Sequence, residues 1–316
     1  MTGRVLITGA TGFVGSHITE TLLQAGYEVV CGARDPNRPR WLSGLSVEIV
    51  HLDLDRPANL QSTLEGVDTV VHAAGITRAR RPADYERVNA VGTRRLASGA
   101  RESGVRRFVQ ISSLAARGPD GLPHPASAYG WSKRRAEAQL LACSGDMETV
   151  ILRPAAVYGP RDADLLPLFK MAKRGWLVLP SGPGLLQPVY VTDVAGAALA
   201  AVRGSYVGSG SFPIAGPELY SWEQVVRSLE KAVGRDISVL RISEGSLVFG
   251  GRVAESVAKL AGSVPVFDRR RAEDLAVYTW TCDVSETERA LGWRANTMLQ
   301  EGLEFTARWY EKNDWI

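Results

Sequence analysis

The stretch Thr8-Gly9-Ala10-Thr11-Gly12-Phe13-Val14-Gly15 decides the fold, because it joins a β-branched run at residues 4–8 to a helical pattern at residues 13–25. The first glycine permits a tight turn, the second lets the backbone approach a pyrophosphate, and the third allows close helix–strand packing. A glycine triplet alone is weak evidence, but this one stands in the strand–loop–helix context that a dinucleotide site requires. We therefore expect these residues to hold a dinucleotide, with its phosphates on the helix N-terminus; the alternative is a purely structural turn.

Short β-branched runs alternate with helical patterns through the first half of the chain. Strands are expected at residues 4–8, 28–33, 47–51, 69–73, 108–112 and 149–152, and helices at 13–25, 82–104 and 127–143. This alternation predicts an α/β fold, a Rossmann-type doubly wound parallel sheet covered by helices on both faces.

After Arg153-Pro154 the alternation loosens and Gly and Pro become frequent. We expect residues 1–155 to form the dinucleotide-binding domain and residues 156–316 to form mainly a smaller substrate-binding lobe. Such a lobe would lie over the carboxyl ends of the strands, where these folds bind ligands. Residues 189–203 are expected to return to the first domain.

Composition excludes several other classes of function. The 316 residues include 37 Lys+Arg and 34 Asp+Glu, a formal charge of +3, which is too balanced to indicate nucleic acid or an anionic membrane as a partner. No run of about 18 apolar residues predicts a membrane span, and glycines stand where a signal peptide needs an apolar run. Three separated cysteines and four histidines without ligand spacing argue against a disulfide framework or a metal site, so we expect a cytoplasmic protein without a metal.

The end of the second expected strand bears on the choice between NAD and NADP. An NAD site places a carboxylate there for the ribose 2′-hydroxyl, whereas this chain has Ala33 followed by Arg34, with Arg38 nearby. A guanidinium can pair with a 2′-phosphate and stack on adenine. NADP(H) is therefore favoured over NAD(H), although Asp35 argues the other way. Asp53, after the third strand, is expected near the adenine amino group, unless it only caps the following turn.

A catalytic set is indicated by Tyr129 and Lys133, which are spaced i, i+4 and so share one helix face. A neighbouring ammonium group favours the phenolate and lowers the pKa of a tyrosine, which can then exchange a proton with an alcohol or ketone oxygen. Ser113, at the end of the fifth strand, can donate a hydrogen bond to the same oxygen. A Tyr and a Lys spaced i, i+4 are common in helices. Their combination with Ser113, in a chain that begins with a nucleotide-binding loop, is a far more specific sign of this catalytic set.

These motifs resemble the extended branch of the short-chain dehydrogenase/reductase superfamily, which contains epimerases, dehydratases and reductases. The resemblance spans nearly the whole chain, through TGATGFVG, HAAG at 72–75, VNAVGT at 88–93, YGWSK, LRPAAVYGP at 152–160 and LGW at 291–293. It implies that Ser113, Tyr129 and Lys133 are catalytic, with Ser112 as the alternate serine, and that Asn89 supports the site. The residues expected to bind the cofactor are Thr8, Gly9, Thr11, Gly12, Phe13, Val14, Gly15, Arg34, Arg38, Asp53, Leu54, Ala73, Ala74, Gly75, Tyr129, Lys133, Pro154 and Val157.

Two departures from the resemblance favour a reductase over a nucleotide-sugar enzyme. Sugar-nucleotide epimerases usually carry Asn and Arg as substrate diphosphate contacts, at places where this chain has Ala156 and Leu186. An unpaired diphosphate in a closing pocket is costly, so their loss disfavours such a substrate. Residues 26–36 instead resemble NADPH-dependent carbonyl reductases, while Arg271-Ala-Glu-Asp274 resembles a phosphate-contacting segment of epimerases or forms a structural ion pair.

The sequence thus predicts an NADP(H)-dependent oxidoreductase acting on a ketone, an aldehyde or a secondary alcohol of an apolar small molecule. A nucleotide-sugar epimerase or dehydratase is the first alternative, and a non-catalytic dinucleotide-binding scaffold is the second. The apolar residues of 165–186 suit a hydrophobic substrate, although most are expected to be core. An amphipathic helix is expected at residues 245–260. The resemblance also implies a homodimer through helices at 82–103 and 127–143. The small residues Ala90, Gly92, Ala97 and Ala100 suit close helix contact there, although they fit packing within one chain equally well.

Overall fold

The computed structural model describes residues 3–182, 184–204, 206–243, 245–246, 248–251 and 279–316. The segment at 271–274 and the greater part of the helix expected at 245–260 lie outside these residues.

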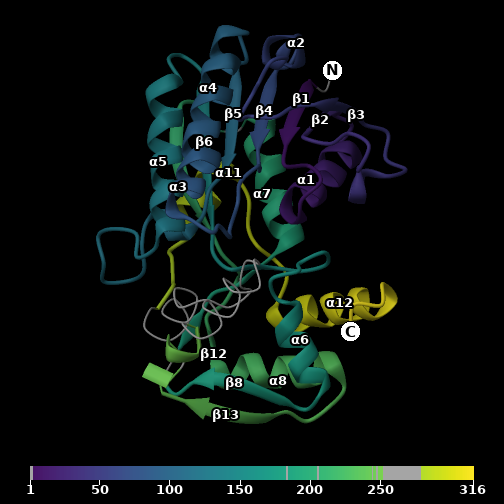
Figure 1. Cartoon of the computed structure of the whole chain (residues 1–316), viewed down its shortest axis with the longest axis vertical. Helices are drawn as coiled ribbons and strands as arrows, with labels where there is room; N and C mark the ends of the chain where they lie inside the picture. The colour runs from purple at the N-terminus through teal and green to yellow at the C-terminus, as the bar shows by residue number, and fades with distance from the viewer. Residues whose placement is uncertain (1–2, 183, 205, 244, 247, 252–278) are drawn as a thin grey trace.

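A central sheet of seven parallel strands has the order β11-β6-β5-β4-β1-β2-β3 (Figure 1). Register places Ile7 between Cys31 and Val71 on the neighbouring strands. The predicted Rossmann-type α/β fold is confirmed, since crossover connections join the parallel strands. The strands are β1 (Arg4–Thr8), β2 (Glu28–Ala33), β3 (Glu48–His51), β4 (Thr69–His72), β5 (Arg107–Ile111), β6 (Glu148–Pro154) and β11 (Ser209–Ile214).

Strand β11 was not predicted from the sequence. Its residues SGSFPI contain Gly and Pro, which are depleted in strands. It lies at the edge of the sheet and pairs only with β6 in that sheet, with Phe212 opposite Leu152. Proline is tolerated in an edge strand because the missing amide need not complete a ladder.

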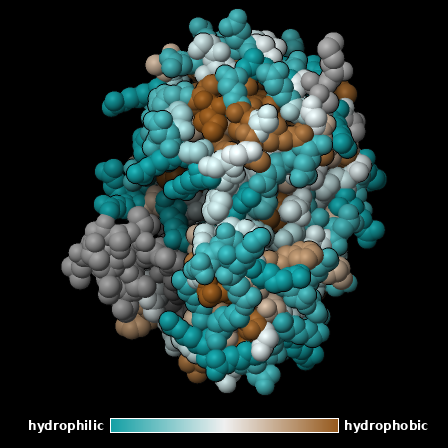
Figure 2. All heavy atoms as spheres, turned by 90° about the vertical axis from the view of Figure 1, so that its right-hand side faces the viewer, coloured by the Kyte–Doolittle hydropathy of each residue, from teal (hydrophilic) through white to brown (hydrophobic). Residues whose placement is uncertain are grey.

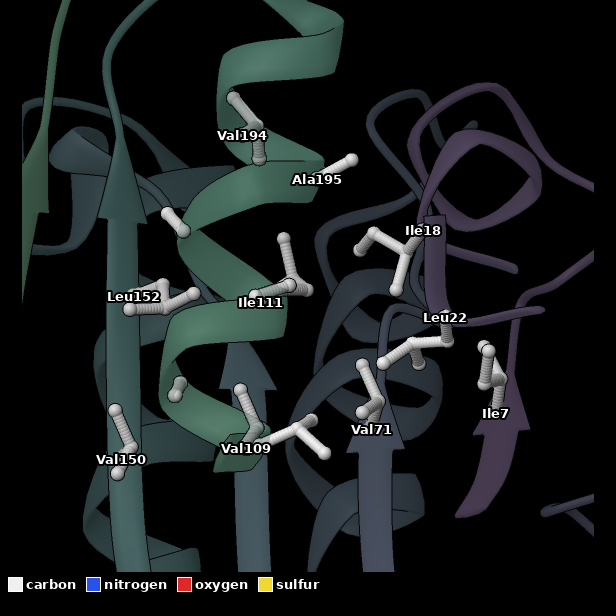
Figure 3. Close-up of a cluster of buried hydrophobic side chains, with 14 of the residues drawn as sticks. Ile7, Ile18, Leu22, Val71, Val109, Ile111, Val150, Leu152, Val194 and Ala195 are labelled. Atoms are coloured by element: carbon white, nitrogen blue, oxygen red, sulfur yellow. The ribbon is translucent and has the colours of Figure 1, made fainter. Parts of the chain in front are cut away.

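Each face of the sheet is covered by helices that pack on alternate strand residues. Val5 and Ile7 belong to a core cluster that includes residues of α1 (Phe13–Gln24) and α7 (Val191–Arg203) (Figure 3). Leu6, between them, belongs to a cluster on the opposite face. That face is covered by α2 (Leu60–Leu64), α4 (Gly92–Glu102) and α5 (Ala128–Cys143), whereas α11 (Ser285–Leu291) contributes to the first cluster.

The long helix expected at residues 82–104 is divided into three segments. α3 (Pro82–Tyr85) is followed by a π-helix (Glu86–Val91), and α4 continues from Gly92. A π-helical turn inside an α-helix is rare and often accompanies a functional site. Asn89 lies within this turn.

A second core forms the lower lobe in Figure 1, at the carboxyl ends of the sheet strands. Strands β8 (Trp176–Pro180) and β13 (Ser238–Ile242) are parallel partners, and α8 (Trp222–Val233) packs against α6 and α12. Six of the apolar residues that the sequence associates with a substrate lobe, including Phe169 and Leu177, pack in or against this core. The remaining elements of this lobe are α6 (Leu166–Lys173), α12 (Leu299–Lys312) and the two-residue strands β7 (Val157–Tyr158), β9 (Leu185–Leu186), β10 (Val189–Tyr190) and β12 (Tyr220–Ser221).

Two short 3₁₀ turns also occur, η1 (Arg40–Leu42) and η3 (Leu114–Ala116). The face shown in Figure 2 is mostly hydrophilic, with apolar residues gathered in its upper part. No helix among the described residues is both long enough and apolar enough to cross a bilayer.

Candidate active site

The glycine-rich loop connects β1 to α1 in the geometry that a pyrophosphate requires. Gly9 has φ +76°, and a Cβ there would lie 2.6 Å from the Ala74 amide nitrogen. A Cβ on Gly15 would lie 2.2 Å from the Gly9 carbonyl oxygen, so any larger residue would separate the helix from the loop. Gly12 caps α1, whose first turn has neither an acidic residue nor a side-chain cap among the described residues. The first amides of the helix are therefore available to an anion, which fits a dinucleotide phosphate.

At the end of β2, the two arginines differ in their surroundings. Arg34 is exposed and forms no ion pair within the described part of the chain. Arg38 faces Asp35, with 3.7 Å between Nε and Oδ2. Asp53 accepts a hydrogen bond from the Asp55 amide at 3.0 Å, which is the turn-capping contact considered from the sequence. Its second carboxylate oxygen leaves room for a further donor.

The α5 helix brings Tyr129 and Lys133 to the site from one face. Lys133 is 7% exposed and donates a hydrogen bond from Nζ to the Ile111 carbonyl oxygen at 2.7 Å. An ammonium group has three N–H donors, so two remain for other partners. Burial lowers the pKa of Lys133 to about 8, and the nearby carboxylate of Glu137 opposes this shift. Tyr129 is partly buried, and its ring packs edge-to-face on Tyr85 with 6.2 Å between centroids.

Neighbouring serines 112 and 113 have different environments. Ser112 is 6% exposed and donates its hydroxyl to the buried carboxylate of Glu137, which also accepts two hydrogen bonds from Arg153. Ser113 is partly exposed, and its Oγ accepts from the Ala115 amide at 3.2 Å. That contact leaves the Ser113 hydroxyl hydrogen available for donation. Of the two serines, Ser113 is thus the one that can donate to an added oxygen.

Asn89 connects the loop after β4 to the α5 helix. Its Oδ1 accepts from the Ile76 amide at 2.9 Å, and its Nδ2 donates to the Ile76 carbonyl oxygen and to Ser132 Oγ. Ser132 immediately precedes Lys133 and donates to the Tyr129 carbonyl oxygen at 2.7 Å. A Cβ on Gly75 would lie 3.1 Å from Asn89 Oδ1 and 3.8 Å from Lys133 Nζ. Four predicted residues, Gly75, Asn89, Tyr129 and Lys133, are therefore brought to one place.

The other predicted cofactor residues flank these groups at the ends of strands. Thr8 ends β1, and Ala73 and Ala74 follow β4 as partly buried residues against Gly9. Leu54 follows β3 and packs near Gly92. Pro154 ends β6, and Val157 pairs with Val189 in the small β7–β10 sheet. The remaining residues of the glycine-rich loop and the start of α1 are partly buried: Thr11, Phe13 and Val14.

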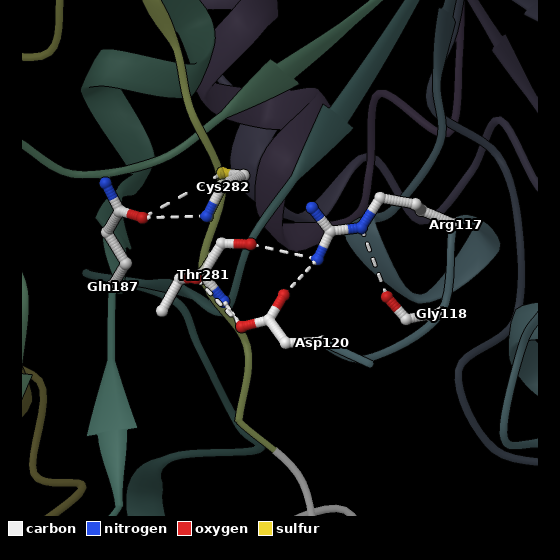
Figure 4. A network of polar contacts seen from close by, with 6 residues as sticks. All are labelled: Arg117, Gly118, Asp120, Gln187, Thr281 and Cys282. Carbon is white, nitrogen blue, oxygen red and sulfur yellow. Dashed lines mark hydrogen bonds and ion pairs between the residues drawn. The ribbon is translucent and has the colours of Figure 1, made fainter. Parts of the chain in front are cut away.

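A polar network that sequence reasoning missed surrounds the loop after Ser113 (Figure 4). Asp120 accepts two hydrogen bonds from Thr281, and Arg117 donates to the Thr281 carbonyl oxygen and to Asp120. The Cys282 amide donates to Gln187 Oε1 at 3.1 Å. Residues 279–282 therefore connect the Ser113 loop to the β9–β10 connection. No sequence motif marks the contacts of Thr281 and Cys282, since they join positions more than 90 residues apart.

The two positions where this chain departs from the epimerase pattern carry apolar side chains, and their surroundings differ. Ala156 is exposed, whereas Leu186 is partly buried against the lower core and forms a bridge with Trp280. Among the described residues, no group of three or more His, Cys, Asp or Glu side chains is arranged to hold a metal ion.

Comparison with known families accounts for this arrangement of loop and helix. The family described as "NAD dependent epimerase/dehydratase family" matches residues 5–212. The chain belongs to this family. It is thus an NAD(P)-dependent enzyme of the extended short-chain dehydrogenase/reductase type, as the sequence motifs predicted.

Individual relatives of this family member fall into two classes. Ceramide reductase of Caulobacter vibrioides is 33% identical over 99% of this chain and 96% of its own length. UDP-glucose 4-epimerase of Vibrio cholerae is 29% identical over 96% of this chain and 94% of its own length. The solved structure of MoeE5 in complex with UDP-glucuronic acid and NAD is 27% identical, with a TM-score of 0.78 over 98% of this chain and 100% of that one.

Proposed function

We propose that the protein is an NADP(H)-dependent oxidoreductase that interconverts a ketone or aldehyde with an alcohol on an apolar small molecule. The observation that carries the proposal is the buried Lys133 on the helix face of Tyr129, next to Gly75 and Asn89. A lysine this deeply buried is unusual unless it has a task, because desolvation disfavours its charge.

In the proposed reaction the bound nicotinamide supplies or accepts a hydride. Tyr129 donates its phenolic proton to the oxygen that becomes the alcohol, or removes that proton in the reverse direction. Ser113 donates a hydrogen bond to the same oxygen and stabilises its developing negative charge. The Lys133 ammonium favours the phenolate of Tyr129, and its remaining N–H groups would hold the nicotinamide ribose. Asn89 positions the helix through Ser132.

Preference for NADP(H) is part of the proposal and rests on the end of β2. Arg34 follows β2, where an NAD site has a carboxylate, and its exposed guanidinium forms no ion pair with any residue that the structure describes. The nearest carboxylate in sequence, Asp35, faces Arg38 instead. An adenosine 2′-phosphate would therefore meet a free cation there.

An apolar substrate is favoured by Ala156 and Leu186, which offer no charged or hydrogen-bonding side chain to a diphosphate. A relative named ceramide reductase, 33% identical over almost the whole chain, supports a substrate of lipid character. The competing candidate, a nucleotide-sugar epimerase, is supported by the UDP-glucose 4-epimerase relative and the UDP-glucuronic acid complex.

Purified protein incubated with substrates of both classes separates these candidates. We expect oxidation of NADPH in the presence of a long-chain ketone such as a 3-ketosphinganine or an alkyl methyl ketone series, with kcat/KM rising with chain length. UDP-glucose and UDP-glucuronic acid, tested for epimerised product by chromatography, should be unchanged. Epimerisation without net NADPH oxidation would contradict the proposal. Tight NADPH binding with no turnover of either class would instead support the non-catalytic scaffold.

A further inference from the structure

A chain of buried hydrogen bonds connects the glycine-rich loop to the catalytic helix through His72. His72 Nδ1 lies 2.6 Å from Thr8 Oγ1, at the start of the loop, and Nε2 lies 2.9 Å from Thr93 Oγ1 on α4. Thr93 Oγ1 lies 2.6 Å from the Asn89 carbonyl oxygen. Each of these four side chains is at most 2% exposed, so water does not compete for their hydrogen bonds.

The direction of every hydrogen bond in this chain follows from counting protons. A carbonyl oxygen only accepts, so the single hydroxyl hydrogen of Thr93 is donated to Asn89. The Thr93 oxygen must then accept from His72 Nε2, which fixes the Nε2–H form of the ring. A neutral imidazole carries one proton, so Nδ1 accepts from the Thr8 hydroxyl.

The ring is neutral in the folded protein. Burial, with the Lys133 ammonium as a second cause, lowers the pKa of His72 to about 3. The order of donation from Thr8 to His72 to Thr93 to Asn89 is therefore the one expected near neutral pH. This series of hydrogen bonds joins two segments of the candidate site. Thr8 begins the dinucleotide loop, and the Asn89 side chain binds Ile76 and Ser132.

We propose that His72 is a positioning residue that couples the dinucleotide loop to the π-helix of Asn89, with its two ring nitrogens serving different ends. Nδ1 holds Thr8 and so acts on cofactor binding. Nε2 holds Thr93, and Thr93 in turn fixes the Asn89 carbonyl group. The Asn89 side chain then positions Ser132, in the turn of α5 that carries Tyr129 and Lys133. The second effect rests on the proposed function, whereas the first needs only dinucleotide binding.

Two substitutions separate the nitrogens. The Oδ1 atom of His72→Asn can stand near Nδ1 and accept from Thr8, but the side chain is too short to reach Thr93. The Nε2 atom of His72→Gln can stand near the imidazole Nε2 and donate to Thr93, but no acceptor remains for Thr8. Loss of one neutral hydrogen bond weakens the affected step by about 10-fold.

The experiment measures NADPH affinity by fluorescence titration and kcat by steady-state assay in both variants. We expect His72→Asn to keep the NADPH Kd within about twofold of wild type and to lower kcat about 10-fold. His72→Gln should show the reverse, a Kd raised about 10-fold and a kcat changed less than threefold. Equal melting-temperature losses in both variants, with Kd and kcat affected alike or not at all, would show that His72 only packs the core and would overturn the proposal.

Thr93→Val and Thr93→Ser give an independent arm if the histidine variants do not fold. Thr93→Val removes the His72–Thr93 contact that His72→Asn also loses, together with the hydrogen bond from Thr93 to the Asn89 carbonyl oxygen, and should lower kcat at least as much. Thr93→Ser keeps the hydroxyl and should have wild-type kcat. A Thr93→Val enzyme with wild-type kcat would contradict the coupling. If wild-type protein binds NADPH but reduces no carbonyl, the proposed function fails while the His72→Gln affinity loss still tests the Thr8 contact.

Discussion

Lys133 is a basic side chain held almost entirely out of solvent, and this burial decides the pH range in which it is charged. Its pKa, lowered to about 8, falls inside the range of an ordinary enzyme assay. In the proposed reaction this positive charge favours the Tyr129 phenolate and would hold the ribose, so its loss should be visible in the rate. The neighbouring Glu137 carboxylate limits the shift by favouring the charged form.

We therefore expect kcat for ketone reduction to decrease as the pH rises through about 8, where Lys133 loses its proton. Deprotonation of Tyr129 at higher pH would act in the same direction, since reduction consumes its proton. A profile of kcat from pH 6 to 10 measures this. Arginine keeps its charge to a much higher pH, so in Lys133→Arg any remaining decrease of kcat should occur at a higher pH than in the wild type. A wild-type rate that stays constant to pH 9.5 would refute the assigned role.

Arg34 is the second residue whose surroundings predict a measurable preference. Replacing it by Ala should weaken NADPH binding about 10- to 100-fold and leave NADH binding within about twofold, because only the 2′-phosphate contact is lost. Titration of both cofactors checks this. Arg38→Ala is the matched control, since its guanidinium faces Asp35 and should matter less. Equal affinities of the wild-type protein for NADPH and NADH would refute the preference.

At the scale of elements, periodicity in the sequence predicted those parts of the fold that local patterns determine. Six strands and the glycine loop were predicted within one or two residues at most boundaries, because buried parallel strands are continuous β-branched runs. The strand β11 and the π-helix at Glu86–Val91 were missed. The first depends on pairing with β6, and the second on hydrogen bonds that no local pattern specifies.

The candidate site shows the same limit. Tyr129 and Lys133 could be predicted because i, i+4 spacing fixes their common face. The His72 and Thr93 contact joins residues 21 positions apart, and Asp120 and Thr281 are 161 positions apart. Such contacts depend on how separate strands, helices and loops meet after folding, which periodicity does not specify.

Residues 279–282 are expected to hold the loop that follows Ser113, through the contacts of Thr281 with Asp120 and Arg117. Asp120→Ala removes the acceptor for both Thr281 hydrogen bonds and the Arg117 ion pair, which loosens the loop that follows Ser113. We expect kcat/KM for the carbonyl substrate to fall about 3- to 10-fold, with NADPH affinity unchanged. Asp146→Ala, at an exposed carboxylate between α5 and β6, is the control. Identical kinetics in both variants would show that the network does not position the site.

In the molecule as a whole, the small residues that the sequence suggested for a dimer contact are not on the surface. Ala90, Gly92, Ala97 and Ala100, which the sequence suggested for close helix contact between chains, are all buried within this chain. They pack inward and cannot form an interface. The outer face of α5 instead exposes Trp131 and Leu141, at 41% and 48%.

We propose that the chain dimerises through this outer face of α5. Light scattering at micromolar concentration should give twice the 34.2 kDa of one chain. Trp131→Glu, which replaces an exposed ring of this face by a charge, should give the single-chain mass with NADPH affinity retained. A wild-type protein that scatters only as a single chain would exclude the dimer.

Proton exchange between Tyr129 and the substrate oxygen, which the proposed reaction requires, can be tested with a single substitution. Tyr129→Phe removes only the phenolic oxygen and keeps the ring that packs on Tyr85. On a verified carbonyl substrate, kcat should fall about 10²- to 10⁴-fold, the usual contribution of general acid–base catalysis, with NADPH affinity and melting temperature unchanged. Tyr85→Phe, which removes the hydroxyl of the neighbouring ring, is the matched control and should keep kcat within about threefold. A Tyr129→Phe enzyme that retains near wild-type kcat would contradict the account.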